Sequence, residues 1–110
     1  MSPILEITLN GKVVIEYPRN TRLPGKQREF LDSMDLDMDE GINLDGKAVD
    51  SPNNQQRSLY VAMKLMRALR SNNKSMITAS CAYLANRQPT LQKVRATEEG
   101  EATTLKLVYE

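Results

Sequence analysis

One segment of this chain has the pattern of a long helix that is buried over most of its surface. It opens at Ser51-Pro52, where a capping serine precedes a proline suited to the first helical turn, and it ends at Asn72-Asn73. Its apolar residues cover more than half of a helical wheel. They are Leu59, Val61, Ala62, Met63, Leu65, Met66, Ala68 and Leu69. We expect this helix, over residues 51–71, to lie at the centre of a domain.

The amino-terminal region predicts a β-hairpin. Asn10-Gly11 accepts the positive φ angles that a type I′ turn needs at both central positions, so strands are expected on either side of it within residues 4–17. Side chains then alternate between two faces. The inner set is Ile7, Leu9, Val13, Ile15 and Tyr17, the outer set is Glu6, Thr8, Lys12 and Glu16, and Val14 is the exception.

Two further hairpins are predicted from turns that contain glycine. Residues 92–98 and 102–109 have the composition of strands on either side of Glu99-Gly100, so they form a closing hairpin. A shorter hairpin is expected at Asp45-Gly46, where residues 42–44 would pair with residues 48–49.

A helix is expected from about Gly25 to Asp35, where apolar residues follow helical spacing. Its end is ambiguous: residues 34–39 alternate between apolar and acidic side chains, which is typical of a strand, although a helix fits nearly as well, so residues 34–40 could be helix, strand or loop. Acidic residues 37–40 at a helix carboxyl end would oppose the helix dipole. We therefore expect the acidic remainder to be a turn or irregular, with Gly41 supplying a left-handed cap.

A third helix, over residues 75–86, places Cys81 on its apolar side beside Ile77 and Leu84. Together these elements predict one α+β domain over residues 1–110, in the order ββαααββ. The amino- and carboxyl-terminal hairpins are expected side by side in one antiparallel sheet. The helices are expected to pack on one face of that sheet.

Charge is strongly segregated along the chain, although the formal net charge is only +1. Residues 29–50 hold eight acidic side chains and one lysine, whereas residues 57–95 hold eight basic side chains and no acidic one. Such blocks either face each other or face a partner. Candidate interaction residues are Arg57, Tyr60, Lys64 and Arg67 on the polar side of the long helix, and Asp35, Asp37, Asp39 and Glu40 in the acidic segment.

The residue types present argue against most enzymes. The chain has no histidine, the commonest general base and metal ligand, and it has no recognisable catalytic motif. We therefore predict no catalytic residues, although an enzyme that uses Asp37 and Asp39 remains a third hypothesis. Glycines are dispersed and form no phosphate-binding loop, so no cofactor is predicted.

The acidic run Asp35-x-Asp37-x-Asp39 invites comparison with a calcium loop. The sixth position of such a loop requires glycine and the twelfth requires glutamate, but Glu40 and Gly46 stand there. No metal site is therefore predicted.

These observations predict a small soluble, non-enzymatic module that interacts with a protein partner or has a regulatory role, using the acidic and basic surfaces. The alternative is nucleic-acid binding by the basic ridge of the long helix. It is disfavoured by a pI of 7.8, by the small aromatic content of 5% and by the lack of a known nucleic-acid-binding motif. Whether the chain forms a homo-oligomer is left open.

A cytoplasmic location is expected, because a single cysteine cannot form an internal disulfide. No apolar run is long enough to cross a bilayer, and no signal-peptide pattern is present at the amino terminus. Membrane partners are therefore not expected.

Overall fold

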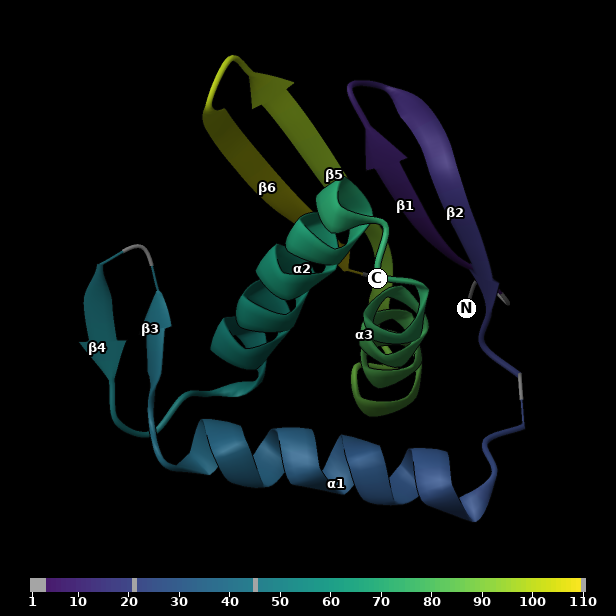
Figure 1. Cartoon of the computed structure of the whole chain (residues 1–110), viewed down its shortest axis with the longest axis vertical. Helices are drawn as coiled ribbons and strands as arrows, with labels where there is room; N and C mark the ends of the chain where they lie inside the picture. The colour runs from purple at the N-terminus through teal and green to yellow at the C-terminus, as the bar shows by residue number, and fades with distance from the viewer. Residues whose placement is uncertain (1–3, 21, 45, 110) are drawn as a thin grey trace.

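The computed structural model describes residues 4–20, 22–44 and 46–109 (Figure 1). Its elements follow the order ββαββααββ, so the predicted order is extended by the small hairpin in the middle. They are β1 (Ile4–Leu9), β2 (Lys12–Pro18), α1 (Gly25–Asp39), β3 (Ile42–Leu44), β4 (Lys47–Val49), α2 (Asn54–Ser71), α3 (Lys74–Arg87), β5 (Leu91–Glu99) and β6 (Ala102–Tyr109).

The terminal hairpins lie side by side in one four-stranded sheet of order β2-β1-β5-β6. The predicted α+β class and the adjacency of the hairpins are confirmed. Each hairpin is antiparallel, but β1 and β5 run parallel, with Glu6 opposite Lys93 and Leu9 opposite Ala96. The sheet is therefore mixed rather than antiparallel throughout. β2 returns the chain to the end of the sheet where β1 begins, so β5 starts from that same end and runs parallel to β1.

The predicted turn between β1 and β2 is present, with φ of 51° at Asn10 and 84° at Gly11. A register shift follows, because Ile7 pairs with Ile15 while Thr8 pairs with Val13. The extra residue is Val14 of β2, and the bulge turns Val13, which was expected inward, to the outer side, where it is 49% exposed. Thr8 of β1 was expected on the outer face and is nevertheless buried. A bulge inserts one residue and so reverses the alternation beyond it.

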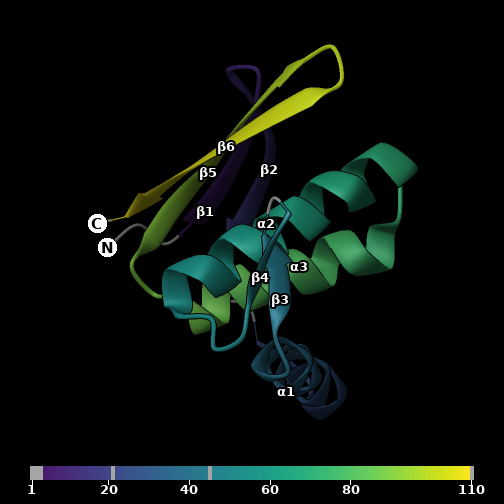
Figure 2. The same ribbon diagram turned by 90° about the vertical axis from the view of Figure 1, so that its left-hand side faces the viewer.

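The helices form two layers on one face of the sheet, as predicted (Figure 2). α2 and α3 lie against the strands, and α1 crosses beneath these two helices on the side away from the sheet. α3 is therefore covered on both sides, and all residues from Ser80 to Ala85 are buried. α1 buries Leu31, Met34 and Met38, partly buries Asp35 and exposes its remaining residues.

The long helix begins later than its sequence predicted. Asn53, rather than Ser51, is its cap: the Asn53 side chain accepts a hydrogen bond from Gln56 N at 2.8 Å, and the Gln56 side chain accepts one from Asn53 N at 2.9 Å. This reciprocal capping box satisfies two backbone donors at once, whereas the third residue after Ser51 is Asn54 and not the glutamate or glutamine that such a box needs. The helix ends as predicted, at Asn72 with φ of 56°.

The middle hairpin is also present, since Ile42 pairs with Val49 and Leu44 pairs with Lys47. Asp45 of its predicted turn lies outside the described residues, and Gly46 has a φ of 85°. Within the described part of the chain, no helix is long and apolar enough to cross a membrane.

The prediction that α1 ends near Asp35 is wrong, because the helix continues through the acidic residues to Asp39. Gly41 follows with φ of 112°, as expected for a left-handed cap. Met34 and Met38 are buried on the inner side of this final part, so the helical conformation gains apolar burial there. Of the acidic side chains that oppose the helix dipole, Asp39 is compensated by its ion pair with Arg57.

Candidate interaction site

The acidic and basic segments meet at Asp35, in the contact between α1 and the two inner helices. One carboxylate oxygen, Oδ1, accepts hydrogen bonds from Arg57 Nη1 at 3.0 Å and from the Tyr83 hydroxyl at 2.6 Å. The other, Oδ2, accepts one from Arg87 Nη1 at 3.1 Å. Arg57 belongs to α2, whereas Tyr83 and Arg87 belong to α3. A single carboxylate thus joins three helices.

Each of the two arginines also binds a second carboxylate of α1. Arg57 Nη2 pairs with Asp39, and Arg87 Nη2 donates to Asp32 Oδ1 at 2.7 Å. The three acidic positions are separated by three and four residues, so they share one face of α1. We call these residues and Tyr83 the Asp35 network. Their arrangement explains why α1 tolerates acidic residues near its carboxyl end.

Partial burial distinguishes the pair of Arg57 and Asp35 at the centre of the network from ordinary surface ion pairs. The side chains of Arg57 and Asp35 are 16% and 29% exposed, so solvent screens their attraction only in part. The hydrogen bond to Asp39 raises the pKa of the Arg57 guanidinium, burial opposes this rise, and Asp35 adds to it. The pKa of Arg87 is raised too, mainly by its hydrogen bond to Asp32. Both arginines therefore remain charged in the fold.

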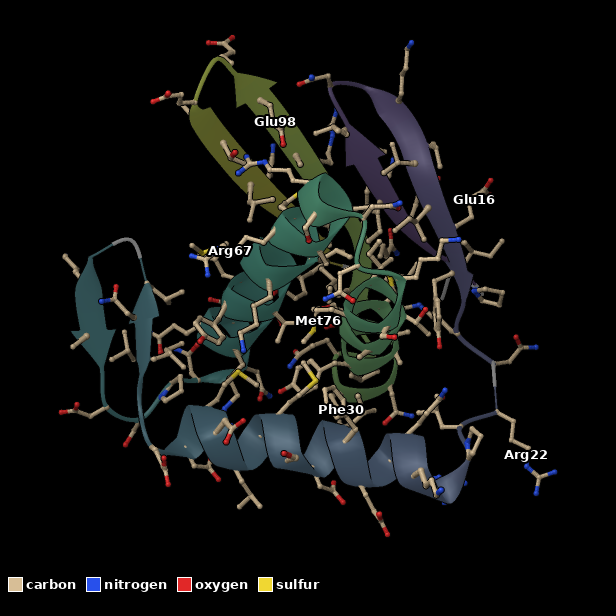
Figure 3. The ribbon with its side chains drawn as sticks, viewed as in Figure 1. Glu16, Arg22, Phe30, Arg67, Met76 and Glu98 are labelled. Atoms are coloured by element: carbon tan, nitrogen blue, oxygen red, sulfur yellow. The ribbon has the colours of Figure 1, made fainter. Side chains whose placement is uncertain are left out.

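Only some of the predicted interaction residues come together. Asp35, Asp39 and Arg57 meet in the Asp35 network, where they bind residues of their own domain. The Lys64 ammonium lies 5.0 Å from the centroid of the Tyr60 ring, and Arg67 is exposed and points away from α2 (Figure 3). The predicted basic ridge is therefore not continuous, because Arg57 is bound by carboxylates.

The remaining acidic candidates lie outside the network. Asp37 is exposed and borders a small cleft with Tyr60 and Lys64, and Glu40 is exposed at the end of α1. Two other members of the basic block also form ion pairs within the domain. Arg70 Nε lies 3.1 Å from Glu98 Oε1, and Lys93 Nζ lies 3.2 Å from Glu6 Oε1.

Four residues that matter in the structure were not singled out from the sequence: Asp32, Tyr83, Arg87 and Phe30. The spacing of Asp32 with Asp35 was a usable signal, because both residues lie within the helix that the sequence predicts. The partners on α3 lie about fifty positions away, and local pattern cannot supply such contacts. Tyr60, which the sequence places on the polar side of the long helix, packs against the core, whereas Phe30 is 43% exposed.

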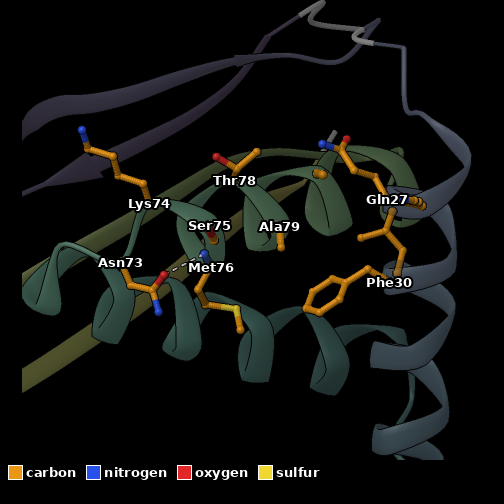
Figure 4. A pocket seen from close by; sticks show the side chains of 11 residues that line it. Gln27, Phe30, Asn73, Lys74, Ser75, Met76, Thr78 and Ala79 are labelled. Carbon is orange, nitrogen blue, oxygen red and sulfur yellow. Dashed lines mark hydrogen bonds between the residues drawn. The ribbon is translucent and has the colours of Figure 1, made fainter.

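Phe30 borders a groove between the amino-terminal halves of α1 and α3, which we call the α1/α3 groove. It has a volume of about 680 Å³. Figure 4 shows Phe30 reaching from α1 toward Met76 and Ala79 on α3. Lys26 and Lys74 are the charged residues that line it, and the remaining lining residues are Gln27, Leu31, Asn73, Ser75, Thr78 and Ala82.

The buried titratable groups of α3 have no feature of a reactive site. Burial raises the pKa of the Cys81 thiol to about 12, so the nucleophilic thiolate is disfavoured. Burial also raises the pKa of Tyr83, and its hydrogen bond to Asp35 adds to this rise. Among the described residues, no three acidic or cysteine side chains are arranged to hold a metal ion.

No protein-family model, curated protein or solved structure matches this chain. The function is therefore argued from the surfaces themselves.

Replacing Arg57 with glutamine is expected to lower the free energy of unfolding by about 2 kcal/mol, because it removes the arginine that binds Asp39 and one of the two arginines that bind Asp35. Arg67→Gln is the matched control on the same helix, and its effect should stay within about 0.5 kcal/mol. Urea unfolding of both variants measures the difference. Equal effects of the two substitutions would mean that the network adds nothing to stability.

Stability is expected to fall as the pH rises above about 9, where the Cys81 thiol ionises in the unfolded chain but not in the folded one. The folded pKa is raised, so the stabilising effect is complete below the unfolded pKa and is lost at higher pH. Between its unfolded and folded pKa values, each such group lowers the free energy of unfolding by about 1.4 kcal/mol per pH unit. Denaturant unfolding of wild type and Cys81→Ala between pH 8 and 11 should give a shallower slope for the variant. Identical slopes would contradict burial of the thiol.

Proposed function

We propose that this protein is a non-enzymatic interaction module that binds an acidic amphipathic helix of a partner protein in the α1/α3 groove. The observation that carries the proposal is an apolar groove whose two charged lining residues, Lys26 and Lys74, are both basic. The acidic and basic segments suggested interaction from the sequence, but Arg57 and Arg87 bind acidic residues of their own domain at the Asp35 network. The docking surface is therefore sought elsewhere on the domain.

The groove offers apolar contacts that the fold itself does not use. Phe30 is 43% exposed, although α1 could have placed a polar residue there, and Met76 and Ala79 are only half-buried. Aromatic side chains and methionine are enriched in protein interfaces, and methionine adapts to differently shaped partners. Two helices form the walls, and an amphipathic helix laid between them would bury its apolar side.

Charge favours an acidic occupant. Lys26 and Lys74 are both exposed in the first turns of α1 and α3, and neither first turn contains an acidic residue. The amino-terminal ends of helices carry a partial positive charge that adds to that of the lysines. Glutamate or aspartate residues flanking the apolar side of a bound helix would meet both sources of positive charge.

A protein segment suits this groove better than a small ligand does. Small-ligand sites usually hold a few buried polar groups that fix the orientation of the ligand. The polar residues at this groove, such as Asn73, Ser75 and Thr78, are exposed, and Asn73 already accepts a hydrogen bond from Met76 N at 3.2 Å. Nucleic-acid binding depended on a continuous basic ridge, and Arg57 no longer contributes to one.

A phage-displayed library of helical peptides, selected on the immobilised protein, tests the proposal. Enriched sequences should carry apolar residues three or four positions apart, flanked by acidic residues. Phe30→Asp should weaken binding of the selected peptides about 30-fold, as expected for loss of an aromatic anchor worth about 2 kcal/mol. Leu36→Asp is the matched control, since Leu36 is 64% exposed on the same helix and does not line the groove.

The proposal fails if no helical sequence is enriched, if the enriched peptides are basic, or if they bind Phe30→Asp as tightly as wild type. Urea unfolding of both aspartate variants verifies that the domain remains folded. A variant that unfolds is replaced by Met76→Lys, which changes the opposite wall of the groove.

A further inference from the structure

We propose that the outer edge of β6 binds an extended, acidic segment of a partner protein, which adds a strand to the sheet and inserts apolar side chains beside α2. β6 is the last strand of the four-stranded sheet, and among the described residues no strand pairs with its outer edge. The outer edge of such a strand presents backbone N–H and C=O groups that an added strand can bind. This inference does not depend on the α1/α3 groove.

The two edges of the sheet differ in their protection. β2, at the opposite edge, contains Lys12, Glu16 and Pro18, and its pairing with β1 is interrupted by a bulge. Charges, proline and bulges are the features by which edge strands avoid pairing with other chains. β6 has Lys106 as its one charged residue among the described positions and has no proline. β6 is therefore the edge suited to accept another strand.

A cavity lies directly beside this edge, between β6, α2 and β3, with a volume of about 470 Å³. Leu105 of β6 lines it together with Leu44 of β3 and with Leu59 and Met63 of α2. Side chains of a strand alternate between the two faces of a sheet, so every second residue of an added strand would point to the same side as Leu105. The cavity gives these side chains an apolar site.

The charges around the cavity favour an acidic occupant. Arg67 and Arg70 line it, Lys106 lies in the strand itself, and no acidic residue lines it. Arg70 is held by Glu98 and Thr103, whereas Arg67 is exposed at the rim. A second copy of this chain would bring the same lysine and arginines against one another, which like-charge repulsion disfavours. An extended segment with acidic residues fits both the strand and the rim.

The probe is a peptide of about ten residues that alternates valine with glutamate, titrated into the isotope-labelled protein and followed by amide NMR shifts and hydrogen exchange. Shifts and new protection should appear in residues 102–109 and not in β2. Two control peptides are used, one with lysine in place of glutamate and one with alternate backbone amides methylated. Both should bind at least tenfold more weakly. The lysine peptide loses the charge attraction, and the methylated peptide loses the hydrogen bonds between strands.

Arg67→Glu should weaken binding of the acidic peptide about tenfold or more, because it reverses the rim charge without changing the sheet. Lys12→Glu, on the opposite edge strand, is the matched control and should leave the affinity unchanged. Phe30→Asp should also leave it unchanged, so failure of this inference is distinguished from failure of the groove proposal.

Four results would overturn the inference: no saturable binding up to about 1 mM peptide, equal affinity for the methylated peptide, equal affinity for the lysine peptide, or shifts centred on β2. A fifth result that would overturn the inference can come from light scattering, which measures the oligomeric state. A dimer whose β6 amides are protected in the absence of peptide would make a second copy the occupant and would overturn the assignment to an acidic partner.

Discussion

The rest of the structure depends on how α1 is held against the inner helices, and one carboxylate is central to that contact. Asp35 accepts hydrogen bonds from residues of both α2 and α3, and the arginines among them bind two further acidic residues of α1. α1 lies on the side of α2 and α3 that faces away from the sheet. Its position therefore depends on this contact and on three buried apolar side chains. A charged contact of this kind also fixes the register of the helix, because carboxylates and guanidinium groups pair only in narrow geometries.

The Asp35 network changes how the charge segregation along the chain is interpreted. From the sequence, opposed charge blocks indicated either an internal contact or a docking surface. In the structure, Arg57, Arg70, Arg87 and Lys93 are all paired with acidic residues of the same domain. What remains at the surface is different: an apolar groove bounded by lysines, and an unprotected edge strand beside an apolar cavity with arginines at its rim. Both features favour acidic partners.

Local signals in the sequence were sufficient for most of the fold. Asn10-Gly11 specified its turn through the backbone alone, and the apolar wheel of residues 51–71 identified the central helix. The errors occur where distant residues decide the local structure. The extension of α1 to Asp39 depends on Arg57, and the inward face of β2 depends on a bulge that the alternation of side chains does not reveal. The parallel pairing of β1 with β5 is likewise a property of the whole chain.

The candidate surfaces were harder to foresee than the fold. Arg57 was expected to contact a partner, but in the structure it binds Asp35 and Asp39 of its own domain. Phe30 was not singled out, because helical spacing alone does not show which apolar residue of a helix stays exposed. Exposure of a single aromatic residue depends on the crossing angle of two helices, which sequence periodicity does not contain. The groove and the open edge both arise from elements that are distant in the chain.

A double-mutant cycle between Asp35 and Arg87 tests the central claim most directly. The cycle uses Asp35→Asn, Arg87→Gln and the double variant, with the free energy of unfolding measured in urea. If the acidic and basic segments are held together at this carboxylate, the coupling energy should be about 1–2 kcal/mol. A coupling energy below about 0.3 kcal/mol, the level found for independent sites, would contradict the account.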